Sequence, residues 1–420
     1  MCVVSLFKRR ISLLLPRHHS VTSMTAALPL DGVKVVDCSQ IMAGPYCTML
    51  LGDMGADVIK VEKPNGDDVR RSGPPFIGDE SAAFLAINRN KRSIVLDLKD
   101  STGVEVAQSL VKDADIFVQN LRPGAMDRLG LGYEALKHLN PQLVYCSISG
   151  YGGTGPSSHR SSFDLVAQGE AGLMSITGIP GGDPVKVGVP ITDLNAGMYA
   201  AFGILSAYVH RLRTGVGQYV DTSLLEAGIA YTFWESAIYF ATGKAPGPAG
   251  SAHPLSAPYQ AFKAADGYFT LGSPNQSNWE RMCYAIGRAD LLEDGRFVSN
   301  ADRNKHLEAL LQTLEATFAE KGKAYWIEVL SEAGVPCGLI RDMAEVYADP
   351  QVVAREMAVE IEHPGVGLIR NIGIPVKLSV TPGSIRRPPP GLGEHTDEVL
   401  GEHGFSNDEI VNMRRLRVVR

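Results

Sequence analysis

The sequence predicts an α/β protein in which a large domain with a parallel sheet is joined to a smaller α+β domain. Its 420 residues exceed what one hydrophobic core usually organises. Short apolar runs alternate with helical patterns through the first half of the chain, and the Gly/Pro-rich stretch 245–258 separates this half from a helix-rich region. Alternating strands and helices form a parallel sheet covered on both faces, so the large domain is expected to be Rossmann-like in architecture.

The predicted strands of the large domain are short runs rich in β-branched residues: 33–36, 56–61, 93–97, 116–119, 143–149 and 219–221. The predicted helices open at the Gly44-Pro45 elbow and run to Leu51, cover 103–112, end near Arg213, and cover 223–239. The first strand-to-helix turn reads QIMAGPYCTMLLG and lacks G-x-G-x-x-G, so the dinucleotide-binding fingerprint is absent.

The second half predicts a smaller unit with its own strands and helices. The pattern indicates β-structure over 259–272, helices over 279–286, 306–319 and 323–333, and a strand over 338–340. The later RRPPPGLG stretch, 386–393, predicts an extended segment on the surface.

Composition excludes several classes of protein. A formal net charge of -6 disfavours a nucleic-acid partner, which requires a clustered excess of Lys and Arg. The six cysteines lie far apart with no Cys-x-x-Cys pair, which indicates reduced thiols and no zinc site. No uncharged stretch reaches the roughly 20 apolar residues of a membrane span.

The first 28 residues have the composition of a targeting leader. This stretch contains four Lys or Arg residues, several Ser and Thr, and no acidic residue. That pattern is typical of a mitochondrial presequence and predicts the matrix as the destination. A secretory signal fits less well because the apolar run 11–15 is short and Arg17 follows it. A disordered leader on a cytoplasmic protein stays open.

Asp193 is the most informative single residue. It lies in VGVPITDLNAGMYAAFG, 187–203, between a β-like run and a long small-residue helix. One interpretation is an N-cap aspartate, and the other is a nucleophile at a strand-to-helix elbow.

Basic and polar side chains flank successive predicted strands. They are Lys63, the Asn90-Lys91-Arg92 run, Lys99, Asn120 with the following Leu121 to Gly124, and Arg128. Ligands of open α/β sheets bind outside the carboxyl ends of the strands, so such residues can converge on one crevice. Each alone fits a solvated surface charge, whereas together they predict a site for a polyphosphate-bearing ligand.

Several ordered blocks, from residue 29 to about 408, resemble the family III CoA-transferases, which include formyl-CoA transferase, carnitine CoA-transferase and α-methylacyl-CoA racemase. The blocks include DGVKVVDCSQIMAGPYCTMLLGDMGADVIKVEKP, NRNKRSIVLDLK, NLRPGAMDRLGLGYE, TDLNAGMYAAFGILSA and PPPGLGEHTDEVL. The resemblance implies that Asp193 is the nucleophile, forming an aspartyl mixed anhydride and then an enzyme-CoA thioester.

The resemblance also implies the ligand contacts. Coenzyme A is a substrate here, and neither a permanently bound cofactor nor a metal is expected. The implied contacts to its nucleotide and phosphates are Lys63, Leu96, Lys99, Asn120, Leu121 and Arg128. The candidates for the glycine-rich backbone of a buried, water-excluding site are Gly169, Gly172, Gly178 and Gly197. The candidate donors to the developing oxyanion are Ser175 or a backbone N–H.

Departures from relatives point to one branch of the family. The racemase branch needs a histidine where this chain has Phe163, and a phenyl ring moves no proton. The poly-glycine loop of formyl-CoA transferase is replaced by GSAHPLSAPYQAFKAADG. This segment resembles the branch that moves CoA from succinyl-CoA to dicarboxylic acids such as glutarate or itaconate. The cations offered for a second carboxylate are His253, Arg71, Arg160 and Lys263.

Three alternatives to this activity stay open: 2-methylacyl-CoA racemisation, formyl-CoA:oxalate transfer, and a non-catalytic CoA-binding or assembly role. For architecture the resemblance implies an interlocked, ring-shaped homodimer. The implied segments are a leader (1–28), the first part of the large Rossmann-like domain (29–230), a small domain (231–336) and a return segment that completes the large domain (337–420).

Overall fold

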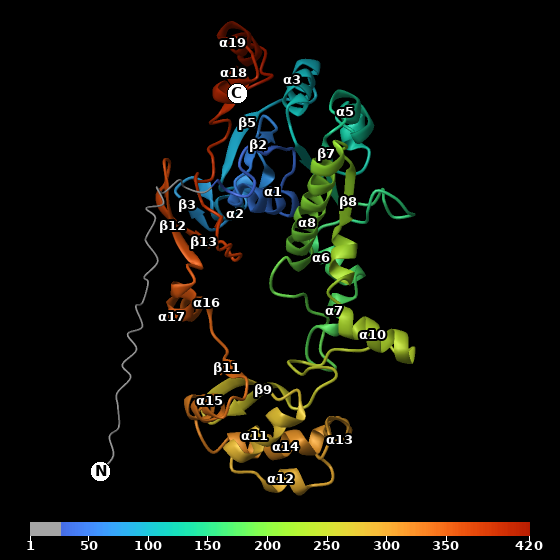
Figure 1. The fold of residues 1–420 in the computed structure, drawn as a ribbon, viewed down its shortest axis with the longest axis vertical. Coiled ribbons are helices and arrows are strands. Elements are labelled where there is room, and N and C mark those ends of the chain that lie inside the picture. The colour runs from blue at the N-terminus through green and yellow to red at the C-terminus, as the bar shows by residue number, and fades with distance from the viewer. Residues whose placement is uncertain (1–26) are drawn as a thin grey trace, which may run out of the picture.

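The computed structural model describes residues 27–420, and the predicted targeting leader lies almost entirely outside these residues. The chain folds into a large unit and a small unit that two separate segments connect (Figure 1). One segment leads out of α10 (Phe233–Thr242), and the other runs from the small sheet to α16 (Met343–Ala348).

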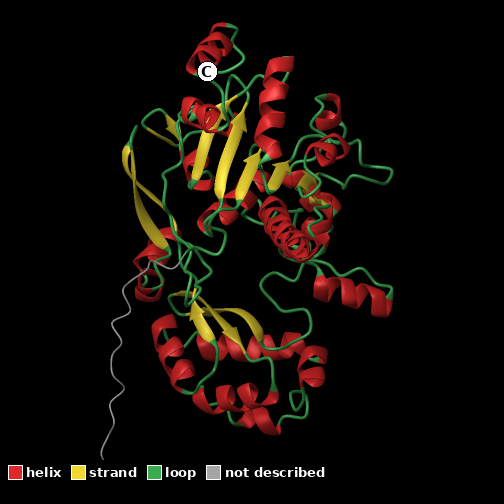
Figure 2. Ribbon diagram, turned by 45° about the horizontal axis from the view of Figure 1, so that its top comes forward, coloured by secondary structure: helices red, strands yellow, loops and turns green. Residues whose placement is uncertain are grey.

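A six-stranded parallel sheet forms the centre of the large unit, as the sequence predicts (Figure 2). Its strands, in spatial order, are β5 (Lys91–Val95), β2 (Asp57–Glu62), β1 (Lys34–Asp37), β6 (Ile116–Gln119), β7 (Val144–Ser149) and β8 (Tyr219–Ser223). The strand order reverses between β1 and β6, which is where open α/β sheets bind ligands.

Helices cover both faces of this sheet. Neighbouring strand residues point to opposite faces, and the apolar side chains on each face are buried in a separate core. Val36 belongs to the core that includes α3 (Ser101–Lys112), α4 (Ala125–Arg128), α5 (Tyr133–Leu139), α18 (Thr396–Glu402) and α19 (Asn407–Arg415). Val35 belongs to the core that includes α1 (Ala43–Asp53), α6 (Asp164–Glu170), α8 (Ile191–Thr214) and α9 (Leu224–Ile229). The short α7 (Leu173–Ile176) follows α6.

The small unit has an antiparallel sheet and a separate core. Its strands are β9 (Tyr259–Ala264), β10 (Gly267–Gly272) and β11 (Cys337–Leu339). Its helices are α11 (Gln276–Ala285), α12 (Asp290–Glu293), α13 (Asn300–Lys305), α14 (Leu307–Phe318) and α15 (Lys323–Glu332). The predicted boundary at Pro336 falls directly before β11, whose pairing with β10 assigns that strand to the small sheet.

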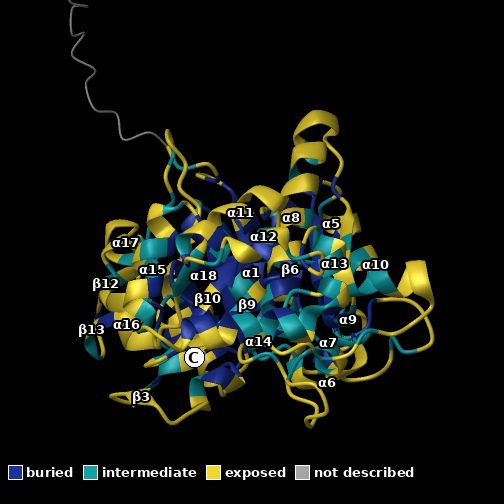
Figure 3. Cartoon of the chain, turned by 90° about the horizontal axis from the view of Figure 1, so that it is seen from below, coloured by how far each residue is buried: buried dark blue, intermediate teal, exposed yellow. Residues whose placement is uncertain are grey.

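The remaining elements lie at the edge of the large unit. After β2 come the 3-10 turn Asp68–Arg71, β3 (Phe76–Ile77), β4 (Glu80–Ser81) and α2 (Ala82–Ile87). The returning chain adds α17 (Pro350–Ala354) and the hairpin of β12 (Ala358–His363) and β13 (Gly367–Ile372), which packs on Leu85 of α2. Seen from below, buried segments lie at the centre and exposed segments at the rim (Figure 3).

Three local predictions were wrong. The single helix over 223–239 is two helices, α9 and α10, and the third strand begins two residues earlier than expected, at Lys91. The proline-rich stretch 386–393 is not wholly on the surface, since Pro389 and Pro390 are buried, and Arg386 anchors it by donating from Nη2 to the backbone oxygens of Gly52 and Ala56, both at 3.0 Å.

Gly197 sets the close approach of α8 to α1. A Cβ atom added there would lie 2.7 Å from the backbone oxygen of Ala43 and 2.9 Å from Cδ1 of Tyr46. We expect Gly197→Ala to lower the free energy of unfolding by about 1–3 kcal/mol and to reduce turnover, because α8 also carries Asp193 one turn earlier.

Urea denaturation of both forms measures this effect. The matched control is Gly401→Ala, since the helical Gly401 has open space around its Cβ position and should gain rather than lose stability. Equal stability of the two variants would contradict the packing argument.

Candidate active site

Asp193 lies in the first turn of α8, as its third residue. The predicted N-cap role is wrong: Pro190 occupies the N-cap position, and no side chain caps the helix locally. Asp164 at the start of α6 supplies that cap instead, because its Oδ1 accepts from the backbone N of Thr192 at 3.0 Å and from its Oγ1 at 2.8 Å. This leaves the Asp193 carboxylate free for chemistry.

A cavity of about 420 Å³ opens onto Asp193. Three of the predicted CoA contacts line it, namely Asn120, Leu121 and Arg128. The same wall includes Phe163 and Arg160 from the segment that follows β7. The nucleophile predicted from its motif therefore faces the carboxyl end of β6, at the reversal of strand order.

A second cavity of about 420 Å³ adjoins the first, and Gln40 and Leu121 line both. The other three predicted CoA contacts, Lys63, Leu96 and Lys99, line this second cavity. The six predicted contacts therefore line two neighbouring cavities, one of which includes Asp193. These two cavities together are called the crevice below. Lys63 Nζ lies 2.8 Å from Asp68 Oδ1 at the rim, so a carboxylate already neighbours this ammonium group.

Asn120 joins the two loops that meet at the reversal of strand order. Its Oδ1 accepts from the backbone N of Gln40 at 2.8 Å, and its Nδ2 donates to the Gln40 backbone oxygen at 2.7 Å. Gln40, Ile41 and Met42, which sequence reasoning did not single out as site residues, line the cavity of Asp193. The available signal was the QIMAGP turn itself, which follows β1 directly.

A network of buried charges lies beneath this turn. Lys60 Nζ contacts Asp67 Oδ2 at 2.9 Å, and Lys91 Nζ contacts Asp37 Oδ2 at 3.1 Å, with all four side chains at most 1% exposed. Asp67 Oδ1 also accepts from the backbone N of Ile41 at 3.0 Å, and Ile41 has a φ of 70°. That left-handed conformation is strained for a β-branched residue, so the network maintains the wall of the site.

The Asn90-Lys91-Arg92 run lines neither of the two cavities, contrary to the interpretation of its sequence as part of a phosphate site. Asn90 donates to Asp53 at 2.8 Å, Lys91 bonds to Asp37, and Arg92 forms ion pairs with Asp57, Glu398 and Glu402. All three side chains are buried among these acceptors. The positive charge of this run serves the fold.

Of the cations predicted for a second carboxylate, only Arg160 lines the cavity of Asp193. Arg71 pairs with Asp68 at the rim of the neighbouring cavity. The His253 ring lies 6.0 Å from the Trp234 ring and 5.1 Å from the Tyr259 ring, beside the small unit. Neither Arg71 nor His253 lines the cavity of Asp193. Ser175, a candidate donor to the oxyanion, donates its hydroxyl to the Gly172 backbone oxygen at 2.7 Å.

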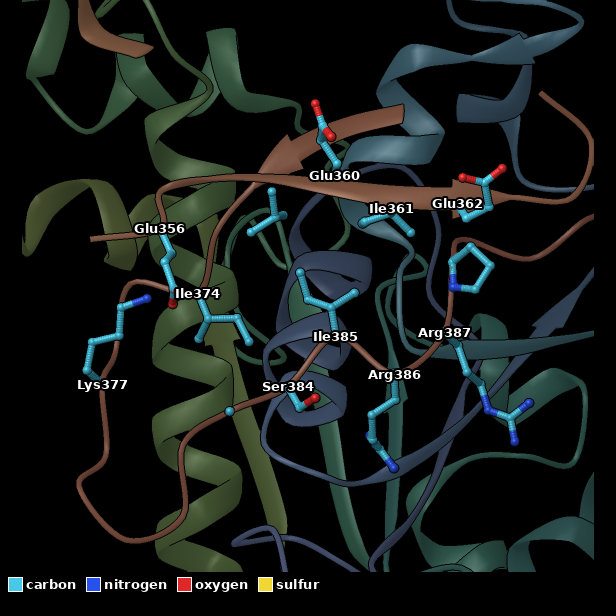
Figure 4. A pocket seen from close by; sticks show the side chains of 13 residues that line it. Glu356, Glu360, Ile361, Glu362, Ile374, Lys377, Ser384, Ile385, Arg386 and Arg387 are labelled. Carbon is cyan, nitrogen blue, oxygen red and sulfur yellow. The ribbon is translucent and has the colours of Figure 1, made fainter. Parts of the chain in front are cut away.

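Another cavity, of about 520 Å³, lies between the β12-β13 hairpin and the segment 383–388 (Figure 4). Acidic side chains of β12, Glu360 and Glu362, and basic side chains of the segment, Arg386 and Arg387, line it. It contains none of the predicted site residues. Within residues 27–420, no group of three or more His, Cys, Asp or Glu side chains is arranged to hold a metal ion. None of the helices in this range is long and apolar enough to cross a membrane.

Comparison with known proteins identifies the family of the chain. The model of CoA-transferase family III matches residues 30–396. The chain belongs to this family. It is therefore a CoA-transferase, and CoA thioesters are its substrates.

Characterised relatives and a solved structure resemble nearly the whole chain. Succinyl-CoA:glutarate CoA-transferase of Homo sapiens is 41% identical over 91% of this chain and 87% of the relative. Succinate--glutarate CoA-transferase of Agrobacterium fabrum is 38% identical over 89% of this chain and 95% of the relative. The crystal structure of a CAIB/BAIF family protein from Brucella suis has a TM-score of 0.79 and 39% identity, covering 90% of this chain and 100% of its own.

The electrostatic setting of Asp193 makes its ionisation depend on pH near neutrality. Burial, and secondarily the charge of Asp164, raise the pKa of Asp193 to about 7. The folded protein therefore keeps a proton on Asp193 that the unfolded chain loses near pH 4. The free energy of unfolding therefore falls as pH rises from about 4 to about 7. Above the pKa of the folded state, ionisation of Asp193 lowers it no further.

We expect Asp193→Asn to raise the melting temperature by a few °C at pH 8 and to change it little at pH 4, because asparagine resembles the protonated acid. Differential scanning calorimetry across this pH range measures the effect. A melting-temperature difference that is the same at both pH values would contradict the raised pKa.

Proposed function

We propose that the protein moves CoA from succinyl-CoA to a small dicarboxylic acid, with Asp193 as the nucleophile. The observation that carries this proposal is the shared crevice: Asp193 lines the same cavity as Asn120 and Arg128, next to the cavity of Lys63 and Lys99. The names of the human and Agrobacterium relatives supply the donor and the class of acceptor.

The first half-reaction transfers CoA to the enzyme. A carboxylate oxygen of Asp193 attacks the thioester carbonyl carbon, and the C–S bond breaks. CoA leaves as a thiolate, and an aspartyl-succinyl anhydride remains on the enzyme. The thiolate then attacks the Asp193 carbonyl carbon, succinate leaves with the bridging oxygen, and Asp193 holds CoA as a thioester. CoA stays bound after it leaves, so that its thiolate remains close to the Asp193 carbonyl carbon. The proposed contacts that hold it are Lys63, Leu96, Lys99, Asn120, Leu121 and Arg128.

The second half-reaction reverses these steps with the acceptor. Its carboxylate attacks the Asp193 thioester, the thiolate leaves again, and an aspartyl-acceptor anhydride forms. Attack of the thiolate on the acceptor carbonyl gives the new CoA ester and returns Asp193 as a carboxylate. An ionised Asp193 is needed at the start, so we expect the rate to increase with pH through about 7.

Racemisation is disfavoured by a residue of the cavity that includes Asp193. Phe163 lines this cavity, at the position where the racemase branch requires a histidine. A phenyl ring cannot act as the second base of a two-base proton transfer.

A homodimer is part of the proposal. Large apolar side chains of α8 and α10 are exposed in the single chain, among them Phe202 (70%), Leu212 (68%), Phe233 (74%) and Phe240 (80%). Apolar patches of this kind mark protein interfaces. We propose that a second copy covers them in an interlocked dimer, with the large domain built from 29–230 and 337–420. Sedimentation equilibrium should give twice the chain mass, and a monomer would refute the arrangement.

We also propose the mitochondrial matrix as the location, on the basic, acid-free composition of the leader. A fluorescent fusion to the first 28 residues should co-localise with a matrix marker, and diffuse cytoplasmic signal would favour the alternative.

An acceptor panel tests the activity. Succinyl-CoA is incubated with glutarate, itaconate, malate, citramalate or oxalate, and new CoA esters are identified by mass spectrometry. We expect esters of glutarate or itaconate. Transfer to oxalate alone would overturn the proposed acceptor class, and absence of any new ester with intact succinyl-CoA would overturn the activity.

A further inference from the structure

Among the cations offered for a second carboxylate, Arg160 is the one that lines the same cavity as Asp193. It lies in the loop between β7 and α6 and lines the 420 Å³ cavity that also holds Asp193. Its side chain is 44% exposed, so the guanidinium group is open to a ligand that enters this cavity.

Two neighbours hold the guanidinium group in place. Arg160 Cζ lies 4.6 Å from the centroid of the Tyr151 ring, within the range of a cation–π contact. Nη1 donates to Glu170 Oε2 at 3.2 Å, and Nη2 donates to Glu170 Oε1 at 2.5 Å. A guanidinium group has five N–H donors, so this pairing leaves three for another acceptor.

We propose that Arg160 binds the remote carboxylate of the dicarboxylic acid while Asp193 reacts with the other end. This inference rests on the proposed function and assigns its acceptor specificity to one side chain. A diacid needs a cation at the end that does not react, and the planar fork of arginine binds a carboxylate in a bidentate manner. Glu170 shares the same guanidinium group and therefore competes with the bound carboxylate.

An internal competition isolates the acceptor step. Each enzyme form receives succinyl-CoA with equal concentrations of glutarate and valerate, which differ in the remote carboxylate, and the two new CoA esters are quantified by mass spectrometry. We expect Arg160→Met to lower the glutaryl-to-valeryl product ratio about 100-fold, because one partner of a charge pair is lost. The ratio does not depend on the rate of the donor step.

The matched control is Arg296→Met. Arg296 also pairs with a neighbouring carboxylate, that of Asp294, and its Cζ lies 4.9 Å from the centroid of an aromatic ring, that of Phe297. It lies in the small unit, next to α12, and lines neither part of the crevice. Its product ratio should equal that of the wild type.

Glu170→Gln tests the competition independently. This change keeps a hydrogen-bond acceptor beside Arg160 but removes the negative charge, so we expect the product ratio to rise several-fold. An unchanged ratio in Arg160→Met, or a fall in Glu170→Gln, would overturn the inference. A wild-type enzyme that forms neither ester here and no ester in the acceptor panel would refute the proposed function itself, which distinguishes the two failures.

Discussion

Replacing Asp193 by alanine lowers CoA transfer by at least about 10⁴-fold, because no other carboxylate at this place can form the anhydride and the enzyme thioester. Release of the new CoA ester, followed by mass spectrometry, measures the loss. Asp193→Asn should show the same loss at early times, since an amide is not a nucleophile for a thioester.

Asp183→Asn is the matched control for this prediction. Asp183 is an exposed carboxylate shortly before α8 and lies outside the crevice, so its loss should change activity less than about twofold. Retention of more than a tenth of the wild-type rate in Asp193→Ala would show that another group accepts CoA.

Replacing Asp37 by alanine lowers the free energy of unfolding by about 3–5 kcal/mol, because it leaves a buried cation without its partner. Asp37 Oδ2 accepts from Lys91 Nζ at 3.1 Å and from Thr48 Oγ1 at 2.6 Å, and the side chain is fully buried. Although burial opposes ionisation, Lys91 and Lys60 hold the pKa of Asp37 below its usual value. Urea denaturation at pH 7 measures the change.

Asp397→Ala provides the comparison for Asp37. Asp397 forms an ion pair with Arg414 at 2.6 Å, but its side chain is 64% exposed, so the expected loss is below about 1 kcal/mol. Equal losses of unfolding free energy in the two variants would contradict the argument that the buried ion pairs of Asp37 stabilise the fold more than an exposed ion pair does.

Four strands of the large unit were predictable because each contains a short run of apolar, buried residues. β1, β2, β6 and β7 all lie where these runs occur. The break after α9 was not predictable from the same pattern, because apolar residues continue from 224 to 241 without a proline or a glycine pair. At the break, Thr232 Oγ1 donates to the backbone oxygen of Ile229 at 2.9 Å, while Leu224 and Ala227 of α9 pack in the same core as α8.

The basic run before the third strand shows the main limit of sequence reasoning about the site. Lys91 and Arg92 have the residue types of a phosphate site, but their partners Asp37 and Asp57 are 54 and 35 positions away in the chain. Spacing along the sequence does not reveal which carboxylates will meet which cations. Only the register of β2 against β5 brings Arg92 beside Asp57.

Asp193 and the six predicted CoA contacts were singled out through their motifs, and the structure places them around two neighbouring cavities. Selection among the cations for the remote carboxylate required coordinates, because the sequence favoured His253 over Arg71, Arg160 and Lys263, whereas only Arg160 of these four lines the cavity of Asp193. The loop that presents Arg160 and the turn with Ile41 have no periodic pattern, so their place beside the nucleophile follows from the sheet order and not from local sequence.

Trapping the covalent intermediate tests the central claim most directly. The enzyme is incubated with succinyl-CoA, quenched with borohydride, which reduces an aspartyl thioester to the alcohol, and digested for peptide mass spectrometry. We predict that the reduced residue is Asp193 and that it appears only when the CoA ester is present. Reduction at any other carboxylate, with Asp193 unmodified, would contradict the account.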